Sequence, residues 1–241
     1  MAQEDRSHDG MPEIDNLHEL TNLLRNANPD EREALAKILN CPGEIAPKQL
    51  SDRFIRLRSG IIGQIFAGYD YKRLVTDVAD HLDIKWEPLL NGREWSQIPS
   101  SEIETAIVAE AFRKMWSNLT HEQQERLAKD LAEKSGDPDF TKHVIAGGAL
   151  FLAGLGGFQI YLLASTLVGG LTSLLGITLP FVVYTTMSRI IGIALGPAGW
   201  GLLAASILWE CTRASWSRLI PGIVFVAYIR HRISTKQGLP S

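Results

Sequence analysis

Cysteine is scarce in this chain, with two residues among 241. Cys41 and Cys211 stand far apart in unlike surroundings, so they offer neither a disulfide framework nor a zinc-ligand spacing. We expect both to be reduced, buried thiols, because a reduced cysteine usually packs as a small apolar side chain. The disulfide-rich and zinc-finger classes are therefore excluded.

The first residues lack a targeting signal. The segment MAQEDRSHDG is polar and acidic, without the apolar core of a secretory leader or the arginine-rich pattern of a transit peptide. We expect residues 1–10 to be disordered and the part that follows to be cytoplasmic.

Charge is nearly absent from the last hundred residues. Residues 1–143 hold 18 Lys and Arg and 26 Asp and Glu, whereas residues 144–241 hold six basic residues and one acid, Glu210. Forty-five consecutive residues, 144–188, carry no charge, and neither does the segment 190–209. One membrane span needs about 20 apolar residues, so the longer run could supply two. This asymmetry predicts two parts with different surroundings.

Sustained period-two alternation is missing as well, which argues against a sheet. The first 138 residues instead repeat apolar residues at helical spacing, in segments at 12–26, 29–39, 47–58, 71–82, 101–118 and 121–135. Helix starts are expected at Asn28 with Glu31, at the capping box Ser101 to Glu104, and at the capping box Thr120 to Gln123. Residues 84–100 read as a loop. The fold class is all-α.

We divide the chain at Gly136-Asp137-Pro138. Residues 11–138 are predicted to form a cytoplasmic α-helical bundle domain that folds by itself. Residues 139–234 are predicted to form a glycine-rich hydrophobic helical hairpin, with helices at 144–168 and 171–187, followed by amphipathic helices. Residues 235–241 are a flexible basic tail. Basic residues follow the hairpin, as they do on cytoplasmic flanks of membrane spans.

The hairpin is the segment expected to enter lipid. Its membrane-inserting positions are represented by Gly148, Gly157, Leu162, Leu174 and Phe181. Small residues allow close helix approach inside a membrane, and three glycines beyond the hairpin have a suitable spacing: Gly192, Gly196 and Gly199. The alternative is a glycine-rich bundle that buries the same residues in its own core.

No catalytic constellation stands out. Asp77 and His81 share a helix face, as two metal ligands would, but no further ligand follows at a suitable spacing, so we interpret them as a solvated face. His121 lacks the second histidine of a metalloprotease helix, and residues 60–63 lack the Lys-Ser/Thr of a phosphate loop. We predict a non-enzymatic protein without metal, cofactor or nucleic-acid partner.

Four segments carry a family resemblance. They are YKRLVTDVAD with Asp77, SEIETAIVAEAFRKMW with Glu102, Glu104 and Trp116, GPAG with Pro197, and ASWSRLIPGIVFVAYIR with Arg218 and Pro221. In this order they resemble the bacterial YaaW family of uncharacterised proteins, which is grouped distantly with the ubiquinol–cytochrome c chaperones. The chaperone grouping concerns the N-terminal half, and the resemblance implies no catalytic residues. The run 144–188 is more hydrophobic than the family pattern.

The sequence thus predicts a non-enzymatic, membrane-associated helical protein of the bacterial inner membrane. Its hairpin would perturb or permeabilise the bilayer, by analogy with the uncharged helical hairpin of colicin-type pore domains. The expected partners are membrane lipid and, through the helical domain, a second copy or another protein. The alternative is a soluble or peripheral chaperone-like binding or assembly module in the cytoplasm, with the apolar half buried in its own core.

Overall fold

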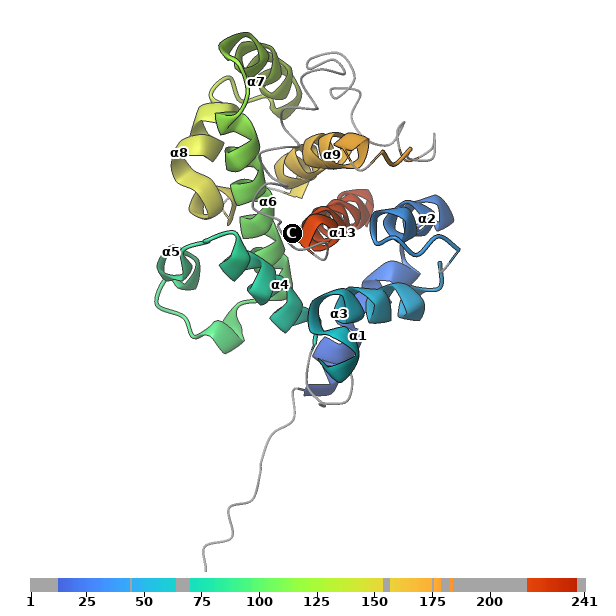
Figure 1. The fold of residues 1–241 in the computed structure, drawn as a ribbon. Helices are drawn as coiled ribbons and strands as arrows, with labels where there is room; N and C mark the ends of the chain where they lie inside the picture. The colour runs from blue at the N-terminus through green and yellow to red at the C-terminus, as the bar shows by residue number, and fades with distance from the viewer. Residues whose placement is uncertain are drawn as a thin grey trace, which may run out of the picture.

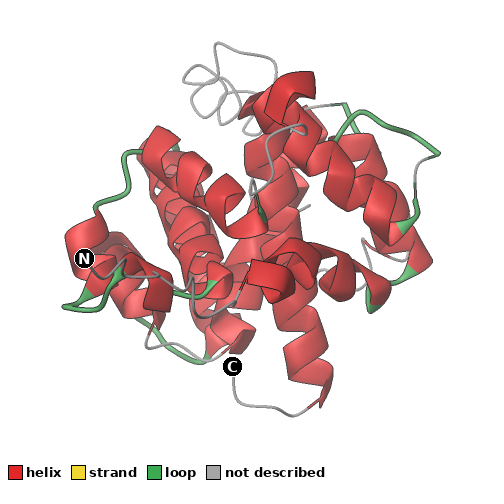
Figure 2. Ribbon diagram, turned by 90° about the horizontal axis from the view of Figure 1, so that it is seen from below, coloured by secondary structure: helices red, strands yellow, loops and turns green. Residues whose placement is uncertain are grey.

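A computed structural model of the chain describes residues 13–43, 45–63, 70–153, 157–174, 176–178, 183 and 216–237. Within these ranges the regular structure is helical and includes no strand, which confirms the all-α prediction (Figure 2). The helices, labelled in Figure 1, are α1 (Glu13–Arg25), α2 (Pro29–Ile38), α3 (Pro47–Gly63), α4 (Tyr71–His81), α5 (Trp86–Leu90), the 3₁₀ helix η1 (Trp95–Gln97), α6 (Ser100–Ser117), α7 (His121–Ser135), α8 (Phe140–Ala153), α9 (Gly157–Leu174) and α13 (Trp216–Gln237).

Helix α13 lies at the centre of the molecule (Figure 1). α9 packs along it, and α2, α3, α4 and α6 contact its other sides. Every residue from Leu219 to Ile229 is buried. A helix that is apolar on all faces is typical of a protein core. The prediction of an amphipathic C-terminal segment is therefore wrong for α13, because neighbouring helices cover each of its faces.

The uncharged run forms helices with other boundaries than predicted. Residues 144–153 of the run lie in α8, and residues 157–174 form α9. Gly169 and Gly170, where the hairpin turn was expected, are buried inside α9, as are all residues from Leu162 to Thr172. The turn prediction is wrong because packing against α13 outweighs the weak helix propensity of two glycines. Among the described residues, no helix combines the length and the apolar composition that crossing a membrane requires.

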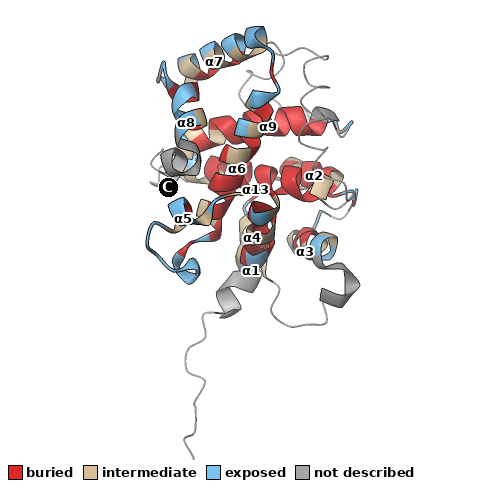
Figure 3. Ribbon diagram, turned by 60° about the vertical axis from the view of Figure 1, so that its left-hand side comes forward, coloured by how far each residue is buried: buried red, intermediate tan, exposed pale blue. Residues whose placement is uncertain are grey.

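Helices on both sides of Gly136 share one core. Gly136 itself ends α7 with φ 73°, so the sequence located a real helix boundary. The buried apolar residues of α1 to α4 and α6 nevertheless form one cluster with those of α8, α9 and α13 (Figure 3). The division at residue 138 thus falls between two helices that contribute to a common core.

Two of the three predicted helix starts are confirmed: the backbone N–H of Asn28 donates to the side chain of Glu31, and Thr120 and Gln123 cap each other reciprocally. The capping box at Ser101 is wrong. Helix α6 begins at Ser100 after Pro99, and the side chain of Glu104 is fully buried instead of capping the helix.

Other boundaries also differ from the sequence prediction. Helix α3 continues to Gly63, and the predicted loop at 84–100 contains α5 and η1. Helix α13 continues through Gln237, so the first residues of the predicted flexible tail are helical. Cys41 is a buried thiol, as expected, whereas Cys211 lies outside the described residues.

Close contact fixes α13 against α3 at Gly222. A Cβ atom on Gly222 would lie 2.8 Å from Cε1 of Phe54 and 3.0 Å from Cδ2 of Leu39. Both neighbours are fully buried, so neither has room to withdraw. The absence of a side chain at Gly222 is therefore what allows the two helices to approach.

Candidate functional site

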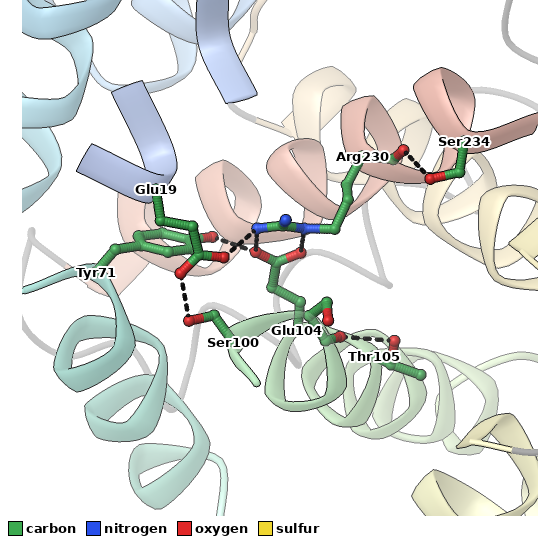
Figure 4. Close-up of polar contacts among 8 residues, drawn as sticks. Glu19, Tyr71, Ser100, Glu104, Thr105, Arg230 and Ser234 are labelled. Carbon is green, nitrogen blue, oxygen red and sulfur yellow. Dashed lines mark hydrogen bonds and ion pairs between the residues drawn. The ribbon is translucent and has the colours of Figure 1, made fainter. Parts of the chain in front are cut away.

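The central helix is joined to α6 by a buried ion pair. Nε of Arg230 donates to Oε2 of Glu104 at 2.8 Å, and Nη2 donates to Oε1 at 2.8 Å (Figure 4). Glu104 is 0% exposed. A bidentate guanidinium–carboxylate pair is strong and directional, and burial makes each charge depend on its partner. The pair therefore fixes the position of α13 relative to α6.

Three further side chains complete this ionic network. The hydroxyl of Tyr71 on α4 donates to Oε1 of Glu104 at 2.8 Å. Nη2 of Arg230 also donates to Oε1 of Glu19 on α1 at 2.8 Å, and the hydroxyl of Ser100 donates to the other oxygen of Glu19 at 2.7 Å. These side chains come from α1, α4, α6 and α13 and point toward one another (Figure 4). The network ties the two ends of the described chain together.

Tyr71 and Arg230 each keep one protonation state near neutral pH. Burial, followed by the adjacent charge of Glu104, raises the pKa of the Tyr71 phenol well above its ordinary value, so the hydroxyl stays a donor. Burial by itself lowers the pKa of Arg230, but the charge and hydrogen bonds of Glu104 raise it by more, and the guanidinium stays charged. Neither group is tuned for proton transfer near neutral pH, which favours a structural role over acid–base catalysis.

A second buried pair lies two residues further along α13. Nη2 of Arg232 donates to Oε2 of Glu31 on α2 at 2.8 Å. Nε of Arg232 lies 2.7 Å from Oε1, an ion-pair contact without hydrogen-bond geometry. Oε2 of Glu31 also accepts the backbone N–H of Asn28 at 2.8 Å. The carboxylate that caps α2 thus also holds the central helix.

His231 lies between these two arginines in the sequence. Its side chain is 4% exposed, and neither ring nitrogen has a hydrogen-bond partner among the described residues. Burial lowers the pKa of this imidazole, Glu104 raises it, and Arg230 lowers it again, with a net decrease. The ring is therefore held in its neutral form.

The start of α13 is anchored to α4. The Trp216 ring stacks on His81 with centroids 4.2 Å apart and an interplanar angle of 3°. Arg58 lies over the Trp216 ring at 5.1 Å and pairs with Asp77 at 2.8 Å. His81 therefore contacts α13 and Asp77 contacts α3, and both residues are partly buried rather than part of a solvated face. In the part of the chain that the structure describes, no group of three or more His, Cys, Asp or Glu side chains could share a metal ion.

The other residues that carried the family resemblance do not form one site. Glu102 pairs with Arg93 at 2.6 Å, Arg218 donates to the carbonyl oxygen of Ile38 at 3.2 Å, Trp116 stacks on Phe112, and Pro221 is buried inside α13. Pro197 lies outside the described residues. Of these contacts, the one between Arg218 and Ile38 joins α13 to α2.

Four of the five positions expected to insert into lipid lie in helices α8 and α9. Leu162 is fully buried in the core, Gly157 begins α9, Leu174 ends α9, and Gly148 lies within α8. Phe181 and the expected helix-contact residues Gly192, Gly196 and Gly199 lie outside the described residues. The burial of Leu162 by protein is the feature that bears most directly on how the apolar half is used.

A hollow of about 420 Å³ opens between α6, α7 and α8. This volume lies in the range of small-ligand sites, about 300–1,000 Å³. Its lining is mainly apolar, with charged side chains among the lining residues, which are Trp116, His121, Gln124, Glu125, Ala128, Thr141, Lys142, Ile145 and Ala146. The arrangement suits a small apolar group or side chain.

Sequence reasoning missed the network but contained signals for it. The ionisable run Arg230-His231-Arg232 directly follows an apolar segment that has no exposed face. Glu104 stands one turn before Val108 and two turns before Phe112, which places an acid on the apolar stripe of α6. An acid on one apolar face and a base at the end of another apolar helix predict a buried pair.

Two proteins of Helicobacter pylori (strain J99 / ATCC 700824), each described as a UPF0174 protein, are similar to this chain. One is 23% identical over 207 residues, covering 79% of this chain and 90% of the relative. At this level of identity the chain shows a remote similarity to these proteins. The second is 21% identical over 172 residues, covering 71% of this chain and 64% of the relative's length. No family model matches the chain, and no solved structure matches it significantly.

Proposed function

We propose that the protein is a non-enzymatic helical binding or assembly module whose apolar half forms its own core. The observation that carries the proposal is the burial of α9: all residues from Leu162 to Thr172 are covered, mainly by α13 and α6. An apolar helix enclosed by protein needs no lipid to bury its surface. This module would contact membranes or partners through its outer surface.

The hollow between α6, α7 and α8 is the site where this module would bind a partner. Leu127 and Leu131 are the buried residues of α7. Helix α7, which forms one wall of the hollow, therefore packs against the protein through a narrow apolar contact. Trp116 offers a large apolar surface, and Glu125 and Lys142 offer charges for orientation. An apolar side chain or helix edge of a partner protein suits this lining. The resemblance to the YaaW family, with its distant chaperone grouping, agrees with such a role.

Fractionation of cells lysed without detergent tests the proposal. The protein is expected in the supernatant, or to be released from membranes by high salt or carbonate. An integral membrane protein and a cytosolic enzyme from the same lysate serve as controls. Retention in the membrane after carbonate treatment would contradict the proposal.

Insertion into the bacterial inner membrane is a second candidate function. The observation that favours it is the uncharged run of 45 residues, of which α9 is one part. Insertion would require α9 and α13 to leave their present contacts, so it applies to a rearranged state. Carbonate-resistant membrane association of the full chain would support this candidate over the first.

A further inference from the structure

Three consecutive ionisable residues of α13 face the interior: His231 and Arg232 are buried, and Arg230 is partly buried. Arg230 and Arg232 each face a carboxylate, whereas His231 has no hydrogen-bond partner among the described residues. A buried polar ring without a partner costs free energy, and an imidazolium without one would cost more. The environment of His231 therefore tolerates only the neutral ring.

The carboxylates near this run are already occupied. From α6, Glu104 accepts from Arg230 and from Tyr71 of α4. From α1, Glu19 accepts from Arg230 and Ser100, and from α2, Glu31 accepts from Arg232 and Asn28. Helix α9 has no charged residue between Gly157 and Leu174, and α3 contacts α13 near Gly222, at the other end of the helix. A protonated His231 could gain a counter-ion only at the expense of an arginine.

The sign of the pH effect follows from the direction of the pKa shift. The pKa of His231 in the folded chain lies below the value for an exposed histidine, about 6.5. Above that pH neither the folded nor the opened form binds the proton, and His231 has no effect on stability. As the pH falls below about 6.5, the opened form takes up the proton first, and the folded form loses stability.

We propose that His231 is an acid-sensitive latch whose protonation loosens α13 from α6 and α2 and uncovers their apolar faces. The position of His231 explains why one proton is effective. It lies between the two arginines whose pairs hold α13, so a third positive charge acts on both pairs at once. This latch goes beyond both candidate functions, because it needs neither lipid nor a partner to operate.

The experiment follows opening of the full chain between pH 7.5 and 5.0, by fluorescence of an apolar-surface dye and by limited proteolysis. For the natural protein, the ratio of open to closed chain should rise by up to about tenfold for each unit of pH below about 6.5, the slope for one proton. His231→Phe and His231→Asn should each flatten that slope by about one proton. His18→Asn, at an exposed position of α1, should leave it unchanged.

Two results would overturn the latch. The first is an unchanged pH dependence in both His231 variants, which would assign acid opening to the carboxylates. The second is that His231 of the natural protein titrates at an ordinary pKa while the chain stays closed. NMR titration of the histidines measures this, and the result remains decisive if a variant fails to fold. Flotation with vesicles of anionic phospholipid at pH 5.5 tests membrane insertion separately, because opening of the latch is measured without lipid.

Discussion

Arg230 and Glu104 are separated by 126 positions in the sequence and form a bidentate pair with both contacts at 2.8 Å. Arg230 lies on α13, in the C-terminal half, and Glu104 lies on α6, in the N-terminal half. The pair is thus a direct bond between the two parts that charge asymmetry distinguishes. Four testable consequences follow from the contacts of α13.

Glu104→Gln should destabilise the fold by about 3 kcal/mol, the lower end of the range for breaking a buried ion pair, because Arg230 loses its buried bidentate carboxylate and keeps only the partly exposed Glu19 as a counter-ion. Urea unfolding followed by circular dichroism measures the loss. Glu102→Gln, on the same helix in an exposed pair with Arg93, is the control and should cost far less. The double variant Glu104→Leu/Arg230→Met should regain most of the lost stability. If Glu104→Gln is as stable as the control variant, the pair does not hold α13.

Glu31→Ala should cost more than the loss of a helix cap. Removing a capping side chain costs about 1 kcal/mol, but Glu31 also neutralises buried Arg232. Gln123→Ala removes the equivalent residue of the exposed box on α7 and isolates the capping contribution. Thermal unfolding of both variants compares the two losses. Equal losses would mean that the Arg232 contact contributes nothing.

Gly222→Ala should destabilise the contact between α13 and α3 by about 1–3 kcal/mol, since the added methyl group meets the ring of Phe54. The effect runs against helix propensity, which favours alanine over glycine by about 1 kcal/mol. Phe54→Leu makes room, so the double variant should be more stable than the sum of the two single changes predicts. Chemical denaturation of the four proteins gives this coupling energy directly. Additive effects would show that the two positions do not touch.

A fragment of residues 1–138 should fail to fold cooperatively, in contrast to the sequence-based expectation of an independent domain. Without α9 and α13 it exposes the inner faces of α2, α4 and α6 and leaves Glu104 and Glu31 without their arginines. Circular dichroism and the sharpness of thermal unfolding measure this, with residues 1–237 as the control. A fragment that unfolds as sharply as the control would establish an independent domain.

Local signals in the sequence located most described helices of the N-terminal part. Asn28 with Glu31 and Thr120 with Gln123 were recognisable because a helix start leaves backbone N–H groups that neighbouring side chains satisfy. The same rule failed for Ser101 and Glu104, since a capping acid and a buried acid have identical local patterns. Only the arrival of Arg230 from the far end of the chain distinguishes them.

By itself, the sequence determined the helical class, several helix boundaries and the presence of a C-terminal part that must hide apolar surface, because these depend on spacing and composition. The tertiary structure decided where that surface is hidden: α9 lies against α13, inside a core shared with the N-terminal helices. It also decided that Glu104 and Glu31 meet the two arginines that flank His231 on α13. A hydropathy pattern indicates that a residue is removed from water, but burial in protein and insertion into lipid both satisfy that requirement. Only long-range packing determines which of the two occurs.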